Sequence, residues 1–267
     1  MALSSGIKIM NELVLYEYCP LCNSRNFELV LKASCEHHAR YDNSLSKIIN
    51  WNQCSDCHHI FRDGYYTDEA LKIVFKDTNE NQIVGYNIEQ QRYVSANMIE
   101  KVIGYKTDGI WLDVGFGNGS LLFTAQEYGF EPFGLDLRQQ SVDEMQKYGI
   151  PAFCSDVCDI ELPLPVSVIS LCDVLEHIPD PKAALNKCFE LLEDDGVLFI
   201  SMPNYESVVW RDLDEKNLNP YWGEIEHCHN FSRSRLYSLL DEHGFKAIRY
   251  GISERYRVCM EVIAIKK

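Results

Sequence analysis

The residues that point most directly to chemistry form the stretch Ile110 to Ser120, which reads IWLDVGFGNGS. An apolar run ends at Asp113, and three glycines follow at alternate positions, Gly115, Gly117 and Gly119. A strand, a glycine turn and a helix start are the order that a nucleotide-binding crossover uses. Glycine lets the backbone turn sharply and leaves no Cβ in the way of a ligand. The stretch therefore predicts a nucleoside site; the alternative is a tight turn with a purely structural role.

The next apolar run adds an acid to this site. The segment EPFGLDL places Asp136 at a strand end, about 20 residues beyond the glycines, where a carboxylate accepts hydrogen bonds from ribose hydroxyls. The glycine spacing is Gly-x-Gly-x-Gly and not the Gly-x-Gly-x-x-Gly of dinucleotide enzymes. That spacing disfavours a nicotinamide-dependent oxidoreductase.

A second chemical group lies near the N-terminus. Two Cys-x-x-Cys pairs, Cys19 with Cys22 and Cys54 with Cys57, are separated by 31 residues. Two such knuckles present four thiolates in the tetrahedral arrangement of a structural zinc site. A redox pair normally accompanies a βαβ unit, which is absent around these cysteines. We expect a closed structural zinc site with no open coordination position.

The remaining cysteines and the nearby histidines have no predicted ligand role. The chain has 11 cysteines, and an odd number with uneven spacing disfavours a complete disulfide framework. Four histidines near the cysteine pairs are expected at the surface because the thiolates already complete a tetrahedron; they are His37, His38, His58 and His59.

The elements that position these residues follow an alternating pattern. From residue 110 onward, apolar runs and helical segments alternate, which implies an α/β fold with a Rossmann-like, seven-stranded, mostly parallel sheet and helices on both faces. The predicted strands are 110–114, 132–136, 151–155, 167–172, 196–202, 245–251 and 258–266. The predicted helices are 119–129, 139–148, 181–193 and 232–243.

Three domains are predicted along the chain. Residues 1–63 are expected to form a small zinc-ribbon-like module, residues 64–105 a helical connector that covers the cofactor cleft, and residues 106–267 the α/β domain. Residues 203–231 are a long insertion rich in aromatic and acidic residues, and a loop of this length in a compact domain is usually functional. It leaves from the ligand-binding edge of the sheet, so we expect it to cover the substrate.

Several ordered motifs resemble the class I S-adenosylmethionine-dependent methyltransferases. The glycine stretch resembles the family's first motif, Asp136 matches the acid after its second strand, and Ser155-Asp156 stands where the family often contacts adenine. Residues 169–179, ISLCDVLEHIP, resemble the fourth-strand motif, and Met202-Pro203-Asn204 follows the fifth strand. The resemblance covers about Tyr86 to Lys267.

This resemblance implies S-adenosylmethionine as the cofactor. Its expected contacts are Asp113, Gly115, Gly117, Gly119, Asp136, Asp156, Asp173 and Arg92, the last through the cofactor's carboxylate.

Methyl transfer from a sulfonium needs alignment of the nucleophile and, for many acceptors, a base. Two histidines are candidate catalytic residues. His177 follows the fourth strand; contact with the cofactor and metal binding by neighbouring Asp173 and Glu176 are alternatives. His229 precedes Ser232, the expected N-cap of the last helix.

The composition of the chain limits the kinds of partner that it can bind. The net charge of −15 disfavours a nucleic-acid partner, because phosphate binding normally uses lysine and arginine. No apolar run approaches the roughly 20 residues of a membrane span, and no signal peptide is evident, so a cytoplasmic protein is expected. A homodimer is left open.

The leading hypothesis is transfer of a methyl group to oxygen or carbon of a small molecule, such as a sugar or another secondary metabolite. The alternatives are an RNA methyltransferase that reads its substrate with the zinc module, and a non-catalytic binding module.

Overall fold

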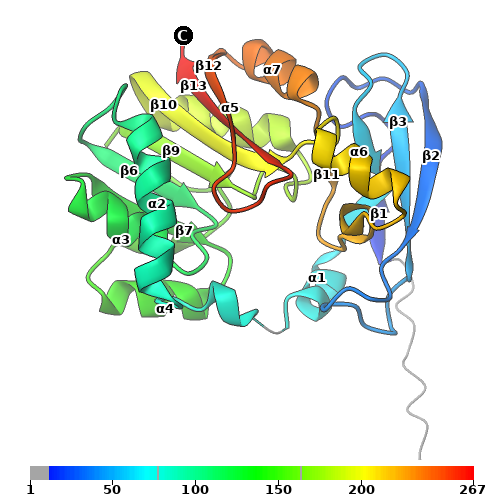
Figure 1. The fold of residues 1–267 in the computed structure, drawn as a ribbon, viewed down its shortest axis with the longest axis horizontal. Coiled ribbons are helices and arrows are strands. Elements are labelled where there is room, and N and C mark those ends of the chain that lie inside the picture. The colour runs from blue at the N-terminus through cyan, green and yellow to red at the C-terminus, as the bar shows by residue number, and fades with distance from the viewer. Residues whose placement is uncertain (1–11, 77, 163) are drawn as a thin grey trace, which may run out of the picture. The chain divides into compact units, whose positions relative to one another are not determined.

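The computed structural model describes residues 12–76, 78–162 and 164–267. The chain divides into two compact units (Figure 1). Of the described residues, those up to 78 and those of 205–235 form one, here called the cysteine unit, and those of 79–204 and 236–267 form the other, here called the sheet unit. These bounds differ from the three predicted domains, because residues 205–235 return to the first unit and no boundary falls at residue 63 or 105.

The sheet unit contains a seven-stranded sheet, as predicted. Its strands lie in the order β12-β13-β10-β9-β6-β7-β8. Only β13 runs against its neighbours β10 and β12, and the other pairs are parallel. The strands are β6 (Ile110–Val114), β7 (Glu131–Asp136), β8 (Ala152–Cys154), β9 (Val166–Cys172), β10 (Leu192–Pro203), β12 (Phe245–Ile252) and β13 (Cys259–Lys266).

The chain order reverses between β6 and β9, and this decides where a ligand binds. From β6 the chain moves outward to β7 and β8, whereas β9 starts the other half of the sheet and continues into β10. In open parallel sheets, ligands bind at such a switch point, beyond the carboxyl ends of the strands. The register sets Val114 opposite Leu135 and Leu171. The residues that follow these three therefore emerge together at that edge.

Helices cover both faces of this sheet. The face that carries Trp111, Val168 and Phe199 packs against α2 (Ile88–Val102) and α3 (Ser120–Glu127). Right-handed crossovers place α3 and α5 (Pro181–Leu191) on opposite faces, because β7 and β10 lie on opposite sides of the switch point. Figure 1 shows α2 in front of the sheet and α5 behind it. The other helices of the sheet unit are η1 (Glu80–Gln82) and α4 (Gln139–Lys147). Helix α7 (Arg233–Glu242) begins in the cysteine unit, and its residues from Leu236 onward belong to the sheet unit.

The cysteine unit is built from short antiparallel strands. A four-stranded sheet has the order β11-β4-β3-β2, and β1 pairs with β5 in a separate two-stranded sheet. Their bounds are β1 (Leu13–Leu15), β2 (Phe27–Ser34), β3 (Ile48–Cys54), β4 (Ile60–Arg62), β5 (Gly64–Tyr66) and β11 (His229–Asn230), and helix α1 spans Asp68–Val74. Trp51 is fully buried at the centre of this unit's core, together with Ile49 and Ile225.

Residues 205–235 are an integral part of the cysteine unit and not a loop. They contain α6 (Val208–Glu215), η2 (Pro220–Gly223) and strand β11, which pairs with β4. The indole nitrogen of Trp51 donates to the carbonyl of Trp222 at 2.8 Å. The guanidinium of Arg62 donates to the carbonyl of Ile225 at 3.0 Å. The aromatic residues of this segment thus form a core, which differs from the predicted substrate-covering loop.

Among the residues that the structure describes, no helix combines the length and the apolar character that crossing a membrane would require.

Candidate cofactor site and metal centre

The glycine loop is the centre of the candidate cofactor site. All three glycines have positive φ, +66° at Gly115, +56° at Gly117 and +76° at Gly119. L-residues rarely adopt this left-handed region, so the loop requires glycine. The backbone N–H of Gly115 donates to the carbonyl of Leu135 at 2.6 Å, which ties the loop to β7.

The three glycines differ in what surrounds them. A Cβ added at Gly115 would lie 2.8 Å from a methyl of Val174, and one at Gly119 would lie 2.1 Å from Cε of Met145. A Cβ at Gly117 would meet nothing closer than the Gly115 carbonyl oxygen, 3.9 Å away. Two of the glycines therefore permit close packing within the protein, whereas Gly117 borders open space that a ligand can fill.

Asp113 is buried beneath this loop, with 3% of its surface exposed. Its carboxylate accepts a hydrogen bond from Ser170 Oγ at 2.5 Å. Burial raises the pKa of Asp113 to about 6, against the lowering effects of the Ser170 hydrogen bond and of the Arg255 charge. The carboxyl therefore sits behind the glycine loop, at the join of β6 and β9.

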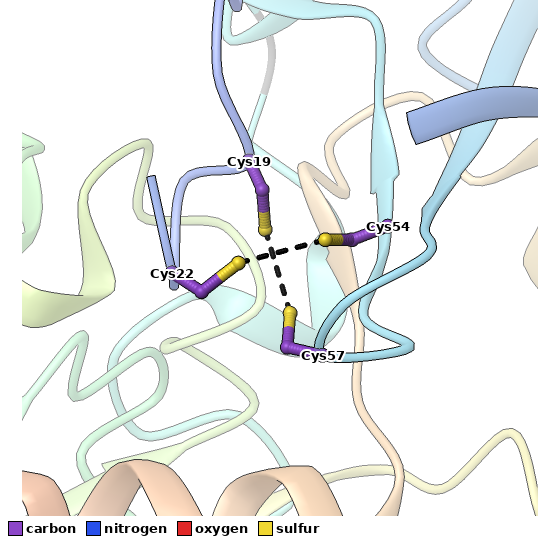
Figure 2. Close-up of side chains that lie close together, drawn as sticks. All are labelled: Cys19, Cys22, Cys54 and Cys57. Atoms are coloured by element: carbon purple, nitrogen blue, oxygen red, sulfur yellow. Dashed lines mark hydrogen bonds between the residues drawn. The ribbon is translucent and has the colours of Figure 1, made fainter. Parts of the chain in front are cut away.

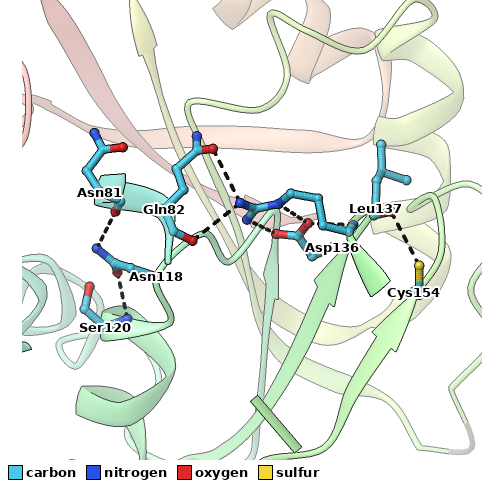
Figure 3. A network of polar contacts seen from close by, with 8 residues as sticks. Asn81, Gln82, Asn118, Ser120, Asp136, Leu137 and Cys154 are labelled. Carbon is cyan, nitrogen blue, oxygen red and sulfur yellow. Dashed lines mark hydrogen bonds and ion pairs between the residues drawn. The ribbon is translucent and has the colours of Figure 1, made fainter. Parts of the chain in front are cut away.

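Asp136 ends β7 next to the loop, and only 6% of it is exposed. The structure pairs it with Arg138, a residue to which the sequence analysis gave no role. Arg138 Nε lies 2.9 Å from Oδ1 and Nη2 lies 2.8 Å from Oδ2, while the backbone N–H of Arg138 also donates to Oδ1 at 2.9 Å (Figure 3). The expected ribose acid is thus held in a bidentate ion pair.

Two further expected cofactor contacts lie at the same edge of the sheet. Asp156 comes two residues after Cys154, the register partner of Asp136, and its carboxylate accepts from the Cys158 backbone N–H at 2.8 Å. Asp173 directly follows β9 and has a φ of +58°, a strained value for a non-glycine residue. Its carboxylate accepts from Ser201 Oγ at 3.2 Å, and burial raises its pKa.

Arg92 does not join this group. Its guanidinium pairs with both carboxylate oxygens of Glu127, with Nε at 2.9 Å from each. Glu127 is the last residue of α3, so this ion pair lies about 10 Å along the helix from the glycine loop at a rise of 1.5 Å per residue. In this structure Arg92 pairs with Glu127 and not with a group at the loop, and its expected contact with the cofactor's carboxylate stays a prediction.

The two candidate catalytic histidines belong to different units. His177 lies in the turn after β9 in the sheet unit, where its backbone N–H donates to the Val174 carbonyl at 2.9 Å. His229 lies on β11 in the cysteine unit and is 1% exposed. Its Nδ1 lies 3.1 Å from Nε2 of His59. The predicted cap is confirmed, because Ser232 Oγ accepts from the Arg235 backbone N–H at 3.0 Å at the start of α7.

His59 corrects one expectation about the surface histidines. His37 and His58 are exposed, but His59 is fully buried. Burial lowers the pKa of His59 well below its usual value, and the neighbouring His229 and Arg235 lower it further. The sequence signal that would have indicated this burial is the apolar pair Ile60-Phe61 directly after His59.

The candidate metal centre gathers the four predicted cysteines. The sulfur atoms of Cys19, Cys22, Cys54 and Cys57 all lie within 4.8 Å of one another (Figure 2). The sulfurs of Cys19 and Cys57 are 3.6 Å apart, and those of Cys22 and Cys54 are 3.5 Å apart. Tetrahedral Zn–S bonds of about 2.3 Å separate the sulfurs by about 3.8 Å, so the arrangement fits a zinc ion.

Both knuckles have the same backbone form. The residue after each pair, Asn23 or His58, has a positive φ of 60° or 58°. The Asn23 N–H donates to the Cys19 carbonyl and the His58 N–H to the Cys54 carbonyl, each at 2.9 Å. All 11 cysteines are free thiols. The two pairs are therefore equivalent turns that aim four reduced sulfurs at one point.

Sequence reasoning missed two cations near the expected site. Arg138 was overlooked although it stands two residues after Asp136, close enough to reach back across the turn. Burial lowers the pKa of Arg255, which lies between β12 and β13, but the nearby groups of Cys172, Asp173 and Asp113 raise that pKa above its usual value. Neither contact follows from a recognised motif, since each depends on how the strand ends meet.

Comparisons with known proteins agree with this fold. A family described as the methyltransferase domain matches residues 87–250. The ubiquinone biosynthesis O-methyltransferase of Leptothrix cholodnii is 29% identical over 127 residues, which are 44% of this chain and 54% of that protein. The protein of the same name from Proteus mirabilis is 29% identical over 179 residues, 59% of this chain and 73% of that protein.

The first of these relatives is therefore matched over about half its length. Among solved structures, magnesium protoporphyrin IX methyltransferase from Synechocystis PCC 6803 with bound SAH superposes with a TM-score of 0.53 at 18% identity, covering 67% of this chain and 84% of that one. That likeness concerns the fold. Because the family match spans more than half of the sequence and contains the glycine loop, Asp136 and the switch point, this chain belongs to the methyltransferase domain family.

Proposed function

We propose that this protein is an S-adenosylmethionine-dependent methyltransferase that acts on a small molecule. The observation that carries the proposal is the open space at Gly117 next to Asp136, at the switch point of the sheet. A ligand there has a backbone that it can approach closely and a carboxylate that recognises a ribose diol. Family membership makes S-adenosylmethionine the nucleoside that fits these features best.

The residues around the loop divide the recognition of this cofactor. Gly117 leaves room for the ligand, and Asp136 is the acceptor for the ribose hydroxyls. Leu137, whose exposed fraction is 69%, offers apolar surface beside Asp136 for the base. Asp156, near the end of the adjacent strand, is the expected contact for the base's polar edge. Asp113 and Asp173 place acidic groups near the cofactor's amino acid part.

Bound S-adenosylmethionine would supply an electrophilic methyl group on a sulfonium. The chain's own task is to align the acceptor and to hold a proton acceptor near it. We retain His177 and His229 as the candidate bases. Full burial beside His229 keeps His59 neutral, and the contact between the two rings orients the His229 ring.

We further propose that the four cysteines hold a structural zinc ion. Four thiolates fill a tetrahedron and leave no open coordination position, so the ion would stabilise the cysteine unit and take no part in methyl transfer. Cys54 ends β3, and Cys57 lies three residues before β4. The ion would therefore fix the hairpin that carries these two strands.

The acceptor we propose is a hydroxyl group of a small molecule. Ubiquinone biosynthesis O-methyltransferases are among the relatives, and their name specifies methylation on oxygen. A net charge of −15 supports a small acceptor over RNA, whose phosphates would be repelled. Phenols and sugars both remain within this class of hydroxyl acceptors.

A methyl-transfer assay would test the proposal. Purified, zinc-loaded protein would be incubated with S-adenosylmethionine and separate panels of phenols, sugar nucleotides and RNA, and the release of S-adenosylhomocysteine would be measured. The proposal expects turnover with a hydroxylated small molecule, and loss of that turnover in a Gly117→Arg variant. Turnover only with RNA would overturn the small-molecule assignment. Binding of the cofactor without turnover on any panel would favour a binding module.

A further inference from the structure

Arg138 occupies most of the hydrogen-bonding capacity of Asp136. An ionised carboxylate offers about four acceptor positions, two on each oxygen. Oδ1 accepts from the Arg138 backbone N–H and from its Nε, while Oδ2 accepts from its Nη2. One acceptor position therefore remains, and it lies on Oδ2.

A ribose diol needs more than this single position. Its 2′ and 3′ hydroxyls each donate one hydrogen bond, and two donors cannot share the one acceptor position that remains on Asp136. Only 6% of the Asp136 side chain and 20% of the Arg138 side chain are exposed, so the guanidinium also covers the carboxylate. Full ribose recognition therefore requires that at least one guanidinium contact be released.

The same guanidinium reaches a second segment. Arg138 Nη1 lies 3.4 Å from both the backbone carbonyl and the side-chain oxygen of Gln82. The segment around Gln82 is also joined to the glycine loop, because Asn118 Nδ2 donates to the Asn81 carbonyl at 3.2 Å (Figure 3). The Gly85 N–H also donates to the Asn118 carbonyl, at 3.0 Å. Arg138 thus connects the expected ribose acid to a segment that already borders the glycine loop.

A purely local role for the Arg138 side chain is the weaker explanation. The backbone N–H of Arg138 already donates to Asp136 Oδ1 at 2.9 Å, and this contact alone fixes the turn between β7 and α4. The bidentate contact is additional to it, and an arginine fork has the planar geometry that fits a carboxylate in two places. The guanidinium therefore competes for the atoms that the ribose would use.

We propose that Arg138 is a latch on the nucleoside site, and this inference rests on the proposed function. The ribose hydroxyls displace the guanidinium from Asp136, and the freed guanidinium keeps Gln82 as its remaining partner. Cofactor affinity is then set by the competition between arginine and ribose. The residue acts through Asp136 and is a specificity-determining residue, not a catalytic one.

Calorimetry with four ligands would test the latch. S-adenosylhomocysteine, adenosine, 2′-deoxyadenosine and 3′-deoxyadenosine would be titrated into wild type, Arg138→Ala and Arg138→Gln, with Lys147→Ala as the control for loss of a cation paired with a carboxylate, that of Glu144. The latch predicts that both Arg138 variants bind adenosine threefold to thirtyfold more tightly than wild type. It also predicts that deletion of one hydroxyl costs wild type less than threefold and the variants about tenfold, because in wild type the guanidinium regains the acceptor position on Asp136 that the missing hydroxyl leaves.

The outcomes separate the latch from the function on which it rests. Weaker or unchanged adenosine binding in both folded Arg138 variants, with wild type still binding, would overturn the latch alone. Absence of binding in wild type and in every variant would overturn the cofactor assignment and the latch with it. Hydrogen exchange without ligand gives a second readout: the latch expects faster exchange at residues 81–85 in Arg138→Ala, and unchanged exchange there would also contradict it.

Discussion

The cysteine cluster and the glycine loop are assembled in different ways. The cluster is made of two short turns, each with both of its thiols within four residues of sequence, and the two turns share one backbone form. The proposed cofactor site takes Gly117, Asp136 and Asp173 from the ends of three strands, and only the parallel sheet brings them together. A site made of repeated local turns is visible as a sequence spacing, whereas a site made by topology also contains residues, such as Arg138, that no spacing indicates.

The two regions should also differ in what holds them together. The cysteine unit has short strands, and the proposed zinc ion would join its two turns. The sheet unit has an extensive apolar core around Trp111 and Phe199. Breaking the metal site should therefore have a large effect on one unit, while single changes near the cofactor site should leave both units folded.

The largest expected effect follows from loss of a metal ligand. Cys54→Ser should remove bound zinc and unfold the cysteine unit, because the binding free energy of structural zinc, about 10–16 kcal/mol in zinc-finger peptides, is folding free energy. Metal content would be measured by plasma mass spectrometry, and folding by the fluorescence of Trp51 and Trp222. The control is Cys154→Ser, which removes an exposed thiol of the sheet unit. Full zinc content in Cys54→Ser would contradict the metal assignment.

The next effect concerns the buried acid of the sheet unit. The native pKa of Asp113 is about 6 and its ordinary value is 3.8, so the folded state keeps a proton that the unfolded state loses between these values. Protonation of Asp113 therefore stabilises the folded state relative to the unfolded state. This stabilisation is complete below pH 3.8 and is lost as the pH rises to about 6. The free energy of unfolding falls by about 3 kcal/mol when this stabilisation is lost.

Asp113→Asn removes this titration and should reveal it. Denaturant unfolding of wild type and variant without ligand should show the variant gaining about 3 kcal/mol relative to wild type between pH 3 and pH 7. The cysteine unit should show no such difference in its own transition. A constant difference between the two proteins across this range would mean that Asp113 titrates as an ordinary carboxyl.

A smaller effect is expected at a helix cap of the sheet unit. Asp180 caps α5, and its carboxylate accepts from the N–H groups of Lys182 and Ala183 at 3.1 and 3.2 Å. Asp180→Ala should lower the free energy of unfolding by about 1 kcal/mol and leave zinc content unchanged. Asp159→Ala, an exposed aspartate outside any helix, serves as the control. Equal losses in both variants would show that the cap contributes nothing specific.

The smallest expected effect is at Arg92. Because its guanidinium is paired with Glu127 at the far end of α3, Arg92→Ala should leave the affinity for S-adenosylhomocysteine within twofold of wild type. A fluorescence or calorimetric titration would measure this. A tenfold loss of affinity would restore the contact that the sequence resemblance implied.

Much of the sheet unit could be predicted because its central strands β6 and β9 are mostly apolar runs that are buried along their whole length. The observed bounds of β6 equal the predicted ones, and the other strands differ by a few residues at their ends. The expected family resemblance is confirmed at the level of the methyltransferase domain. A strand that is buried on both faces of a sheet needs apolar residues along its whole length, so it can be recognised in the sequence as an apolar run.

The rest could not be predicted because it depends on contacts between distant positions. Trp51 and Trp222 are 171 positions apart, and their hydrogen bond joins the predicted loop to the cysteine unit. His59 and His229 are 170 positions apart, so a histidine expected at the surface is buried. The roles of the site residues, including both candidate bases, stay predictions.

The central claim is that the glycine loop of the sheet unit holds S-adenosylmethionine, and calorimetry on a matched pair of glycine variants tests it most directly. Gly117 and Gly149 both have positive φ and no heavy atom closer than 3.9 Å to an added Cβ, so alanine causes similar backbone strain at each, about 1–2 kcal/mol. Only Gly117 borders the proposed ligand. The account predicts micromolar S-adenosylhomocysteine binding in wild type and Gly149→Ala, and at least tenfold weaker binding in Gly117→Ala. Equal affinity in the two variants, or no binding by folded, zinc-loaded wild type, would contradict it.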